Sequence, residues 1–64
     1  MNKIMVTICL DYTDDKTQSF EVNTNDVALI MMITRGTLRS SLAHKATAYD
    51  EQGFDICTYE KLYE

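Results

Sequence analysis

The stretch DVALIMMITRGTLRSSLAH, residues 26–44, is the only part of this 64-residue chain long and apolar enough to cover a sheet. Its apolar residues recur every three or four positions, and two hydroxyl residues fall on the same stripe, which is the spacing of an amphipathic helix. The sequence therefore predicts one helix of about five turns. The stripe expected to face the core comprises Val27, Ile30, Met31, Thr34, Leu38, Ser41 and Leu42.

Both ends of this helix carry the residues that helix ends favour. Thr24 or Asn25 can cap the start, and Asp26 suits the positive end of the helix dipole. The basic residues that suit its negative end follow later, at Arg39, His44 and Lys45. Gly36 in the middle costs about 1 kcal/mol relative to Ala, so it marks either a close neighbour or a break into two helices. We favour one helix.

The start of this helix is apolar on nearly every side. Leu29, Met32 and Ile33 fall off the predicted core stripe, as does Ala28. Either a strongly twisted sheet and the chain ends cover these side chains, or a second copy of the chain does. We name Leu29, Met32 and Ile33 as the expected homodimer interface. The apolar run VALIMMI has seven residues and is far shorter than the ~20 of a membrane span.

The segments on either side of the helix alternate in the manner of strands. Residues 3–11 place Ile4, Val6, Ile8 and Leu10 on one side, and residues 19–24 repeat the pattern after the polar turn 13–18. Residues 46–50 and 54–59 form two further strand candidates around Gly53, which can take a positive φ. In the last segment we expect Phe54, Ile56 and Thr58 to face the core, with Asp55, Cys57 and Tyr59 outward.

This order predicts one α+β domain over residues 1–64, β-β-α-β-β, with two layers. The expected sheet has four antiparallel strands with the long helix on one face. A right-handed crossover would place the third strand beside the first, which gives the order second, first, third, fourth. The second and fourth strands are then edges, where the acids Glu21, Asp55 and Glu60 oppose non-specific pairing.

Charge is distributed unevenly along the chain. The net charge is −4, but the middle, residues 27–49, carries +3 and no acid, whereas the two flanks together carry −7. Broad binding to DNA or RNA phosphates requires clustered Lys and Arg, so we expect no direct nucleic-acid contact. A basic or nucleic-acid-binding host protein fits the acidic flanks better. With two cysteines, no CxxC pair and no apolar leader, the sequence indicates a cytoplasmic protein with reduced thiols.

Catalytic and metal-binding patterns are weak. The carboxylate pairs Asp14–Asp15 and Asp50–Glu51 lie in predicted turns, where turn chemistry explains them. His44 is the only histidine, and its position near the helix end explains it without a zinc or thiolate partner. Ser40 and Ser41 are expected in mid-helix, without a nucleophile elbow. We therefore expect no enzyme activity, no metal and no cofactor.

Two surfaces remain as candidate binding sites. The first mixes tyrosines, which supply contact area at little entropic cost, with carboxylates that steer a basic target. This expected partner-binding surface comprises Tyr49, Asp50, Glu51, Asp55, Tyr59 and Glu60. The second is the pair Arg35 and Arg39, which share one helical face and could hold an anion such as a nucleotide phosphate.

Two short strand motifs carry a resemblance to a known family. Ser19-Phe20-Glu21-Val22 before the helix and Gly53-Phe54-Asp55-Ile56 after it resemble the small phage-encoded RNA polymerase inhibitors of the phage T7 type. Thr58 and Glu60 stand where that family carries the arginines of its polymerase contact. The resemblance is therefore at the level of a class, the short acidic phage proteins that block a host enzyme, including anti-restriction and anti-CRISPR proteins.

These observations together predict a small, acidic anti-defence type of phage protein. We expect it to inhibit a host nucleic-acid-processing or defence protein by protein–protein interaction, through occlusion, in the host cytoplasm. The alternative is a small oligomeric protein that binds a nucleotide or other anion through Arg35 and Arg39.

Overall fold

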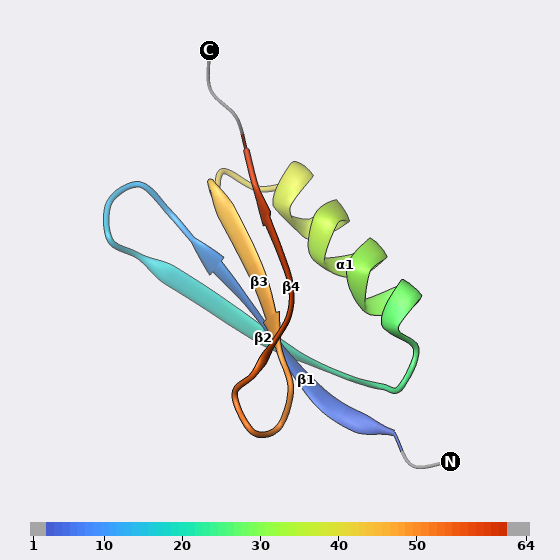
Figure 1. Ribbon diagram of the computed structural model, residues 1–64. Coiled ribbons are helices and arrows are strands. Elements are labelled where there is room, and N and C mark those ends of the chain that lie inside the picture. Colours follow the sequence, from blue (N-terminus) through green and yellow to red (C-terminus); the bar gives the residue numbers. More distant parts are fainter. Residues whose placement is uncertain (1–2, 62–64) are drawn as a thin grey trace.

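A computed structural model describes residues 3–61 and contains four strands and one helix. The elements are β1 (Ile4–Asp11), β2 (Thr17–Thr24), α1 (Val27–Arg39), β3 (Lys45–Tyr49) and β4 (Asp55–Glu60). The strands form one antiparallel sheet in the order β2-β1-β3-β4, and α1 lies on one face (Figure 1). The predicted α+β class, element order and strand order are therefore confirmed.

The core lies between α1 and one face of the sheet. The alternation in β1 places Val6, Ile8 and Leu10 in this layer, where all three are buried. From α1, only Ile30, Thr34 and Leu38 are fully buried. The Thr34 hydroxyl donates to the Ile30 carbonyl oxygen at 2.6 Å, so this buried polar group is satisfied within the helix.

The helix begins at Val27, one or two residues later than the predicted caps Thr24 or Asn25 would give, and it also ends earlier than predicted. Asp26 is the N-cap, and its side chain accepts a hydrogen bond from the Leu29 N–H at 3.3 Å. At the other end the Ser40 hydroxyl donates to the Thr37 carbonyl at 3.3 Å, and the Ser41 hydroxyl donates to the Leu38 carbonyl at 3.1 Å. Because these hydroxyls satisfy carbonyls that a further turn would use, the helix stops at Arg39. The prediction of helix through His44, with both serines inside it, was wrong.

The buried stripe also differs from the predicted one. Val27, Met31 and Leu42 are 55%, 42% and 87% exposed, although helical spacing assigned them to the core. Leu42 lies beyond the end of α1, so helical spacing no longer applies to it. Ile33, predicted to lie off the stripe, packs against the core cluster that contains Val6 and Ile8. The helix is thus rotated relative to the prediction, because it packs mainly against β3 and β4.

The two hairpins use different turn residues. Between β1 and β2 the Tyr12 N–H donates to the Lys16 carbonyl at 2.9 Å, and Asp15 adopts a positive φ of 64°. Between β3 and β4 Gly53 has a φ of 87°, as predicted. There the Asp50 carboxylate accepts the N–H groups of Gln52 and Phe54, both at 2.9 Å, which fixes the loop.

A β-bulge at Ile56 reverses the expected facing of β4 from Cys57 onward, while Ile56 itself packs against the core cluster of Val6 and Ile8, as predicted. Ala48 is opposite Cys57 and Tyr49 is opposite Asp55, so Ile56 has no partner in β3. Cys57 and Tyr59 therefore lie on the core side of the sheet, where Tyr59 packs against the cluster of Leu10 and Leu38. The prediction that Phe54 and Thr58 face the core was wrong: Phe54 is 70% exposed and precedes β4, and Thr58 is exposed.

Candidate functional site

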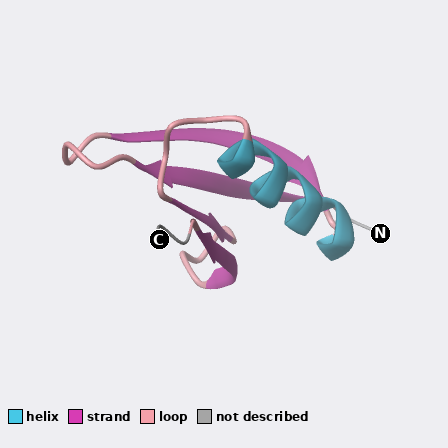
Figure 2. Cartoon of the chain, turned by 90° about the horizontal axis from the view of Figure 1, so that it is seen from above, coloured by secondary structure: helices cyan, strands magenta, loops and turns pink. Residues whose placement is uncertain are grey.

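No helix of the described residues packs on the sheet face opposite α1, which we call the outer face (Figure 2), although neighbouring side chains bury Thr47 at its centre. In β1 the side chains that alternate with the core residues point to it. The residues paired with them in β2 and β3, and the residues of β4 paired with β3, point their side chains to the same face. The outer face contains three four-residue rows, Thr17–Asp11–Lys45–Glu60, Ser19–Cys9–Thr47–Thr58 and Glu21–Thr7–Tyr49–Asp55, and beyond them the pair Asn23–Met5.

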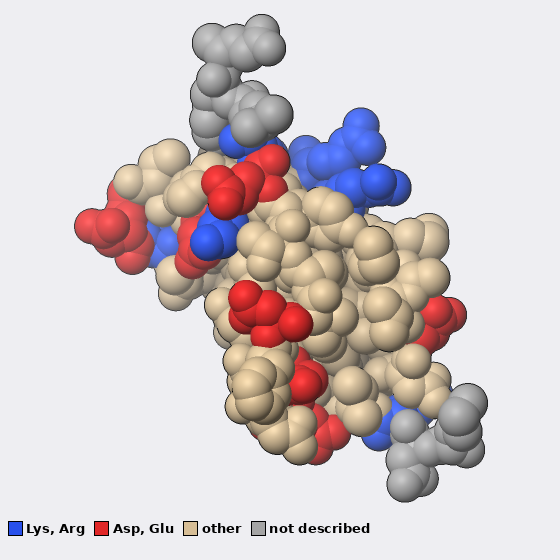
Figure 3. All heavy atoms as spheres, in the orientation of Figure 1, with Lys and Arg blue, Asp and Glu red and all other residues tan. Residues whose placement is uncertain are grey.

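The outer face is acidic at its margins and neutral at its centre. Asp11, Glu21, Asp55 and Glu60 come from three different strands, and Lys45 is the one base among these positions. The middle row holds only hydroxyl and thiol side chains. Figure 3, seen toward β4, shows carboxylates along the β4 edge and its turn, while basic side chains gather at the C-terminal end of α1. Lys45 stays among the carboxylates, so the fold separates the opposite charges only in part.

Three of the six predicted partner-binding residues share this face. Tyr49 and Asp55 are direct cross-strand partners, and Glu60 lies opposite Lys45. The register also brings in Asp11 and Glu21, which sequence reasoning did not group with them. The alternation in the first two strands already assigned both carboxylates outward. The missing information was which strands lie side by side.

The other three predicted residues have internal roles. The Asp50 carboxylate holds the β3–β4 loop, as described above. The Glu51 carboxylate accepts the Met5 N–H at 3.2 Å, a group of β1 that lies beyond the end of β3. Tyr59 packs on the core side, so its ring is not an outer-face contact. The bulge and the loop geometry thus direct these three side chains away from the outer face.

The two cysteines lie on opposite faces of the sheet. Cys9 lies in the middle row of the outer face, and burial, followed by the nearby Asp11 charge, raises the pKa of its thiol. A raised pKa keeps the thiol protonated and lowers its nucleophilicity. Cys57 lies on the opposite face, and both cysteines are free. Among residues 3–61, no three His, Cys, Asp or Glu side chains are placed to hold a metal ion.

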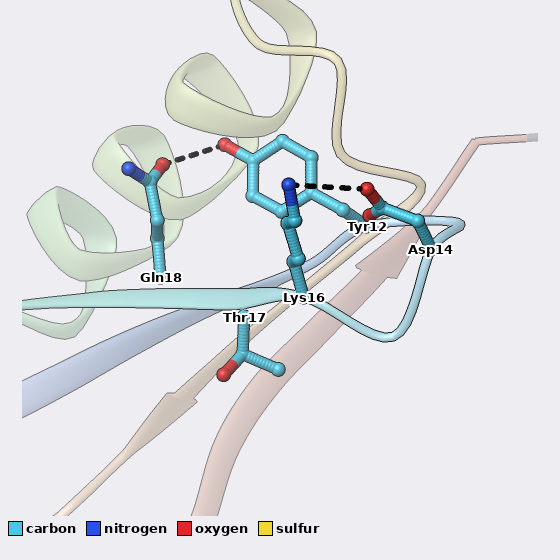
Figure 4. A pocket seen from close by; sticks show the side chains of 5 residues that line it. All are labelled: Tyr12, Asp14, Lys16, Thr17 and Gln18. Carbon is cyan, nitrogen blue, oxygen red and sulfur yellow. Dashed lines mark hydrogen bonds and ion pairs between the residues drawn. The ribbon is translucent and has the colours of Figure 1, made fainter.

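A hollow of about 490 Å³ lies beside the β1–β2 turn (Figure 4). The Tyr12 hydroxyl donates to the Gln18 side-chain oxygen at 2.7 Å, and Lys16 pairs with Asp14 at 3.5 Å. Thr17 points to the opposite side of β2 from Gln18. The polar groups therefore satisfy one another and do not converge on a ligand position, so this hollow carries no assigned chemistry.

The helix presents both remaining candidate sets to solvent. Arg35 and Arg39 are exposed one turn apart, and within residues 3–61 neither lies within 4.0 Å of a carboxylate oxygen. Leu29 and Met32 are 40% and 64% exposed, whereas Ile33 is half-buried in the core. The predicted dimer set is therefore split between an exposed pair and a core residue.

Comparison with protein-family models, curated proteins and solved structures finds no match for this chain. Within the described residues, no helix has the length and apolar character required to cross a membrane.

Proposed function

We propose that this protein is a binding inhibitor that uses the outer face to cover a basic surface of another protein. The observation that carries the proposal is the outer face itself, with four carboxylates around a neutral centre. The raised pKa of the Cys9 thiol keeps it protonated, which disfavours a nucleophilic role for this residue of the outer face. We infer that inhibition occurs by occlusion and without turnover.

On this face, charged groups and contact area have different roles in binding. Exposed carboxylates at Glu21, Asp55 and Glu60 attract a basic target over a distance of about 8 Å at physiological salt. Tyr49, half-buried beside Asp55, supplies a rigid ring next to the neutral row. We expect the carboxylates to set the association rate and Tyr49 to set the dissociation rate.

The class of partner follows from the same charges and from the motif resemblance. An acidic face selects a basic protein surface, and such surfaces are common on proteins that bind nucleic acid. The resemblance of residues 19–22 and 53–56 to phage RNA polymerase inhibitors supports a host nucleic-acid-processing or defence protein. The site of action would be the host cytoplasm.

The test begins with capture from a bacterial host lysate at low and physiological salt, followed by kinetics with the purified partner. Asp55→Lys and Glu60→Lys should slow association, and Tyr49→Ala should speed dissociation, with a cost of about 2 kcal/mol. Asp14→Lys is the matched control, since it makes the same charge change in the β1–β2 loop, off the outer face. Capture of no partner at either salt, or unchanged binding by all three outer-face variants, would overturn the proposal.

A second candidate function is anion binding through Arg35 and Arg39. It is favoured by their exposure on one side of α1 without a carboxylate partner in residues 3–61. A nucleotide that raises the melting temperature of the parent protein, but not of an Arg35→Gln, Arg39→Gln double variant, would support this candidate. Absence of any nucleotide-dependent shift would remove it.

A further inference from the structure

We propose that the free edge of β2 pairs antiparallel with β2 of a second copy, so that two sheets join into one of eight strands. This assembly is independent of the proposed inhibitory function. It rests on the backbone groups, side chains and charge of β2, which differ from those of the other edge strand.

The two edges of the sheet are protected to different degrees. β4 has six residues, is interrupted by the bulge at Ile56, and carries Asp55 and Glu60 at its ends. β2 has eight residues, pairs with β1 without interruption, and contains Glu21 as its one charge. Bulges and charges are the features that prevent edge pairing. The β2 edge has no bulge and carries only one charge.

Three hydrogen bonds identify which backbone groups of β2 point to the free edge. The Asp11 carbonyl accepts the His44 N–H, and the Met5 N–H donates to Glu51, so both residues direct their backbone away from β2. The Tyr12 N–H bonds to the Lys16 carbonyl across the first hairpin. Since bonded and non-bonded pairs alternate along an antiparallel ladder, the partners of Asp11, Cys9, Thr7 and Met5 face outward. These partners are Thr17, Ser19, Glu21 and Asn23.

One register joins these groups about a two-fold axis with full overlap. If Ser19 pairs with Glu21 of the second copy, Thr17 pairs with Asn23, and the axis passes between the two Phe20 residues. Every outward N–H and C=O from Thr17 to Asn23 then has a partner. The single acid lies opposite a serine and not opposite the other copy's acid, which avoids like-charge repulsion.

The same pairing covers apolar side chains that the single copy leaves in water. Phe20 lies on the α1 side of β2, beside Ile8, and is 36% exposed because α1 packs over β3 and β4. Val22, two residues after Phe20 on the same side of β2, is half-buried against the core cluster of Val6 and Ile8. Pairing of β2 would bring the two Phe20 side chains against each other on the α1 side of the joined sheet.

The self-complementary register, together with the low charge of β2, favours a second copy as the occupant of this edge. β2 is neutral except for Glu21, so a strongly charged strand gains nothing there, while a basic partner is attracted to the acidic outer face. A two-fold axis perpendicular to the sheet keeps both outer faces on one side. The joined sheet would therefore present two acidic faces next to each other.

The decisive variant is Ser19→Pro, measured by sedimentation equilibrium over a range of concentrations. Proline removes the Ser19 N–H, which points to the free edge and has no role in the β1–β2 ladder, so the folded monomer should persist while the dimer is lost. Ser19→Ala is the matched control and should dimerise as the parent does. Circular dichroism of the proline variant checks that the monomer is folded.

Charge variants at the same position test the register and do not depend on tolerance of proline. Ser19→Glu places acids opposite Glu21 twice and should weaken the dimer by roughly ten-fold, whereas Ser19→Lys should strengthen it by a few-fold. A Phe20→Cys variant with Cys9 and Cys57 changed to Ser should form an intermolecular disulfide, because a non-bonded pair has Cα atoms about 4.5 Å apart. A parent protein that is monomeric up to its solubility limit, or a dimer unaffected by Ser19→Glu, Ser19→Lys and folded Ser19→Pro, would overturn the proposal.

Discussion

Tyr49 of β3 lies directly opposite Asp55 of β4, and the next residue, Ile56, has no partner in β3. This single unpaired residue places Tyr49 and Asp55 together on the outer face and turns Tyr59 to the core side. The two tyrosines of the hairpin therefore have different roles, although they are equivalent in the sequence pattern.

The first prediction separates these two roles. Tyr59→Ala removes a half-buried ring from the cluster of Leu10 and Leu38, so it should lower the free energy of unfolding by about 1–3 kcal/mol. Tyr49→Ala, on the outer face, should change it by less than about 1 kcal/mol. Urea denaturation followed by circular dichroism measures both. Equal losses for the two variants would contradict the assigned facing of β4.

A second prediction concerns the end of α1. Leu38 is 3% exposed and Leu42 is 87% exposed, although both fall on the stripe that helical spacing assigns to the core. Leu38→Ala should cost about 2–4 kcal/mol, a large part of the stability of so small a chain, and Leu42→Ala about 0.5 kcal/mol or less. Thermal melts of the two matched variants decide this. A comparable loss for Leu42→Ala would place the helix end beyond Arg39.

A third prediction uses the two positive φ angles. Asp15 has a φ of 64°, where a residue with a Cβ is disfavoured, so Asp15→Gly should raise stability by about 0.5–1 kcal/mol. Gly53 has a φ of 87°, so Gly53→Ala should lower stability by about 1 kcal/mol even though an added Cβ meets no atom within 4 Å. Chemical denaturation provides both values. If Gly53→Ala were neutral, the loop would have to adopt another conformation.

The fourth prediction is the alkaline response of Cys9. Burial, and secondarily the charge of Asp11, raise the pKa of its thiol in the folded protein. The unfolded chain therefore loses this proton first, so the contribution of Cys9 to stability is full below the unfolded pKa and is lost as pH rises through the folded pKa. Between a pH below the unfolded-state pKa of the thiol and a pH above its folded-state pKa, the free energy of unfolding should decrease more in the parent protein than in Cys9→Ser. Cys57→Ser, on the other face, should retain the parental response.

Part of this structure follows from local pattern alone. Alternation in residues 4–10 and the turn glycine Gly53 each act over a few positions, so the sequence was sufficient to predict the strands and the second hairpin. The start of the helix was predicted to within two residues, although the N-cap is Asp26 and not Thr24 or Asn25. The strand order followed from the handedness of the crossover. The outward facing of Asp11 and Glu21 was also readable, because alternation has a fixed period of two.

Other features were decided by packing between distant segments. Helical spacing specifies a stripe of residues, but it does not specify how far the helix continues or which side of it meets the sheet. Here the hydroxyl bonds from Ser40 and Ser41 end α1. Packing against β3 and β4 determines that Ile33 is covered and Met31 is not. The bulge at Ile56 arises from pairing with Ala48 and Tyr49, which no local pattern encodes. Alternation in the sequence therefore specified the individual strands, and only their register assembled Asp11, Glu21, Tyr49 and Asp55 into one surface, because cross-strand neighbours are far apart in the chain.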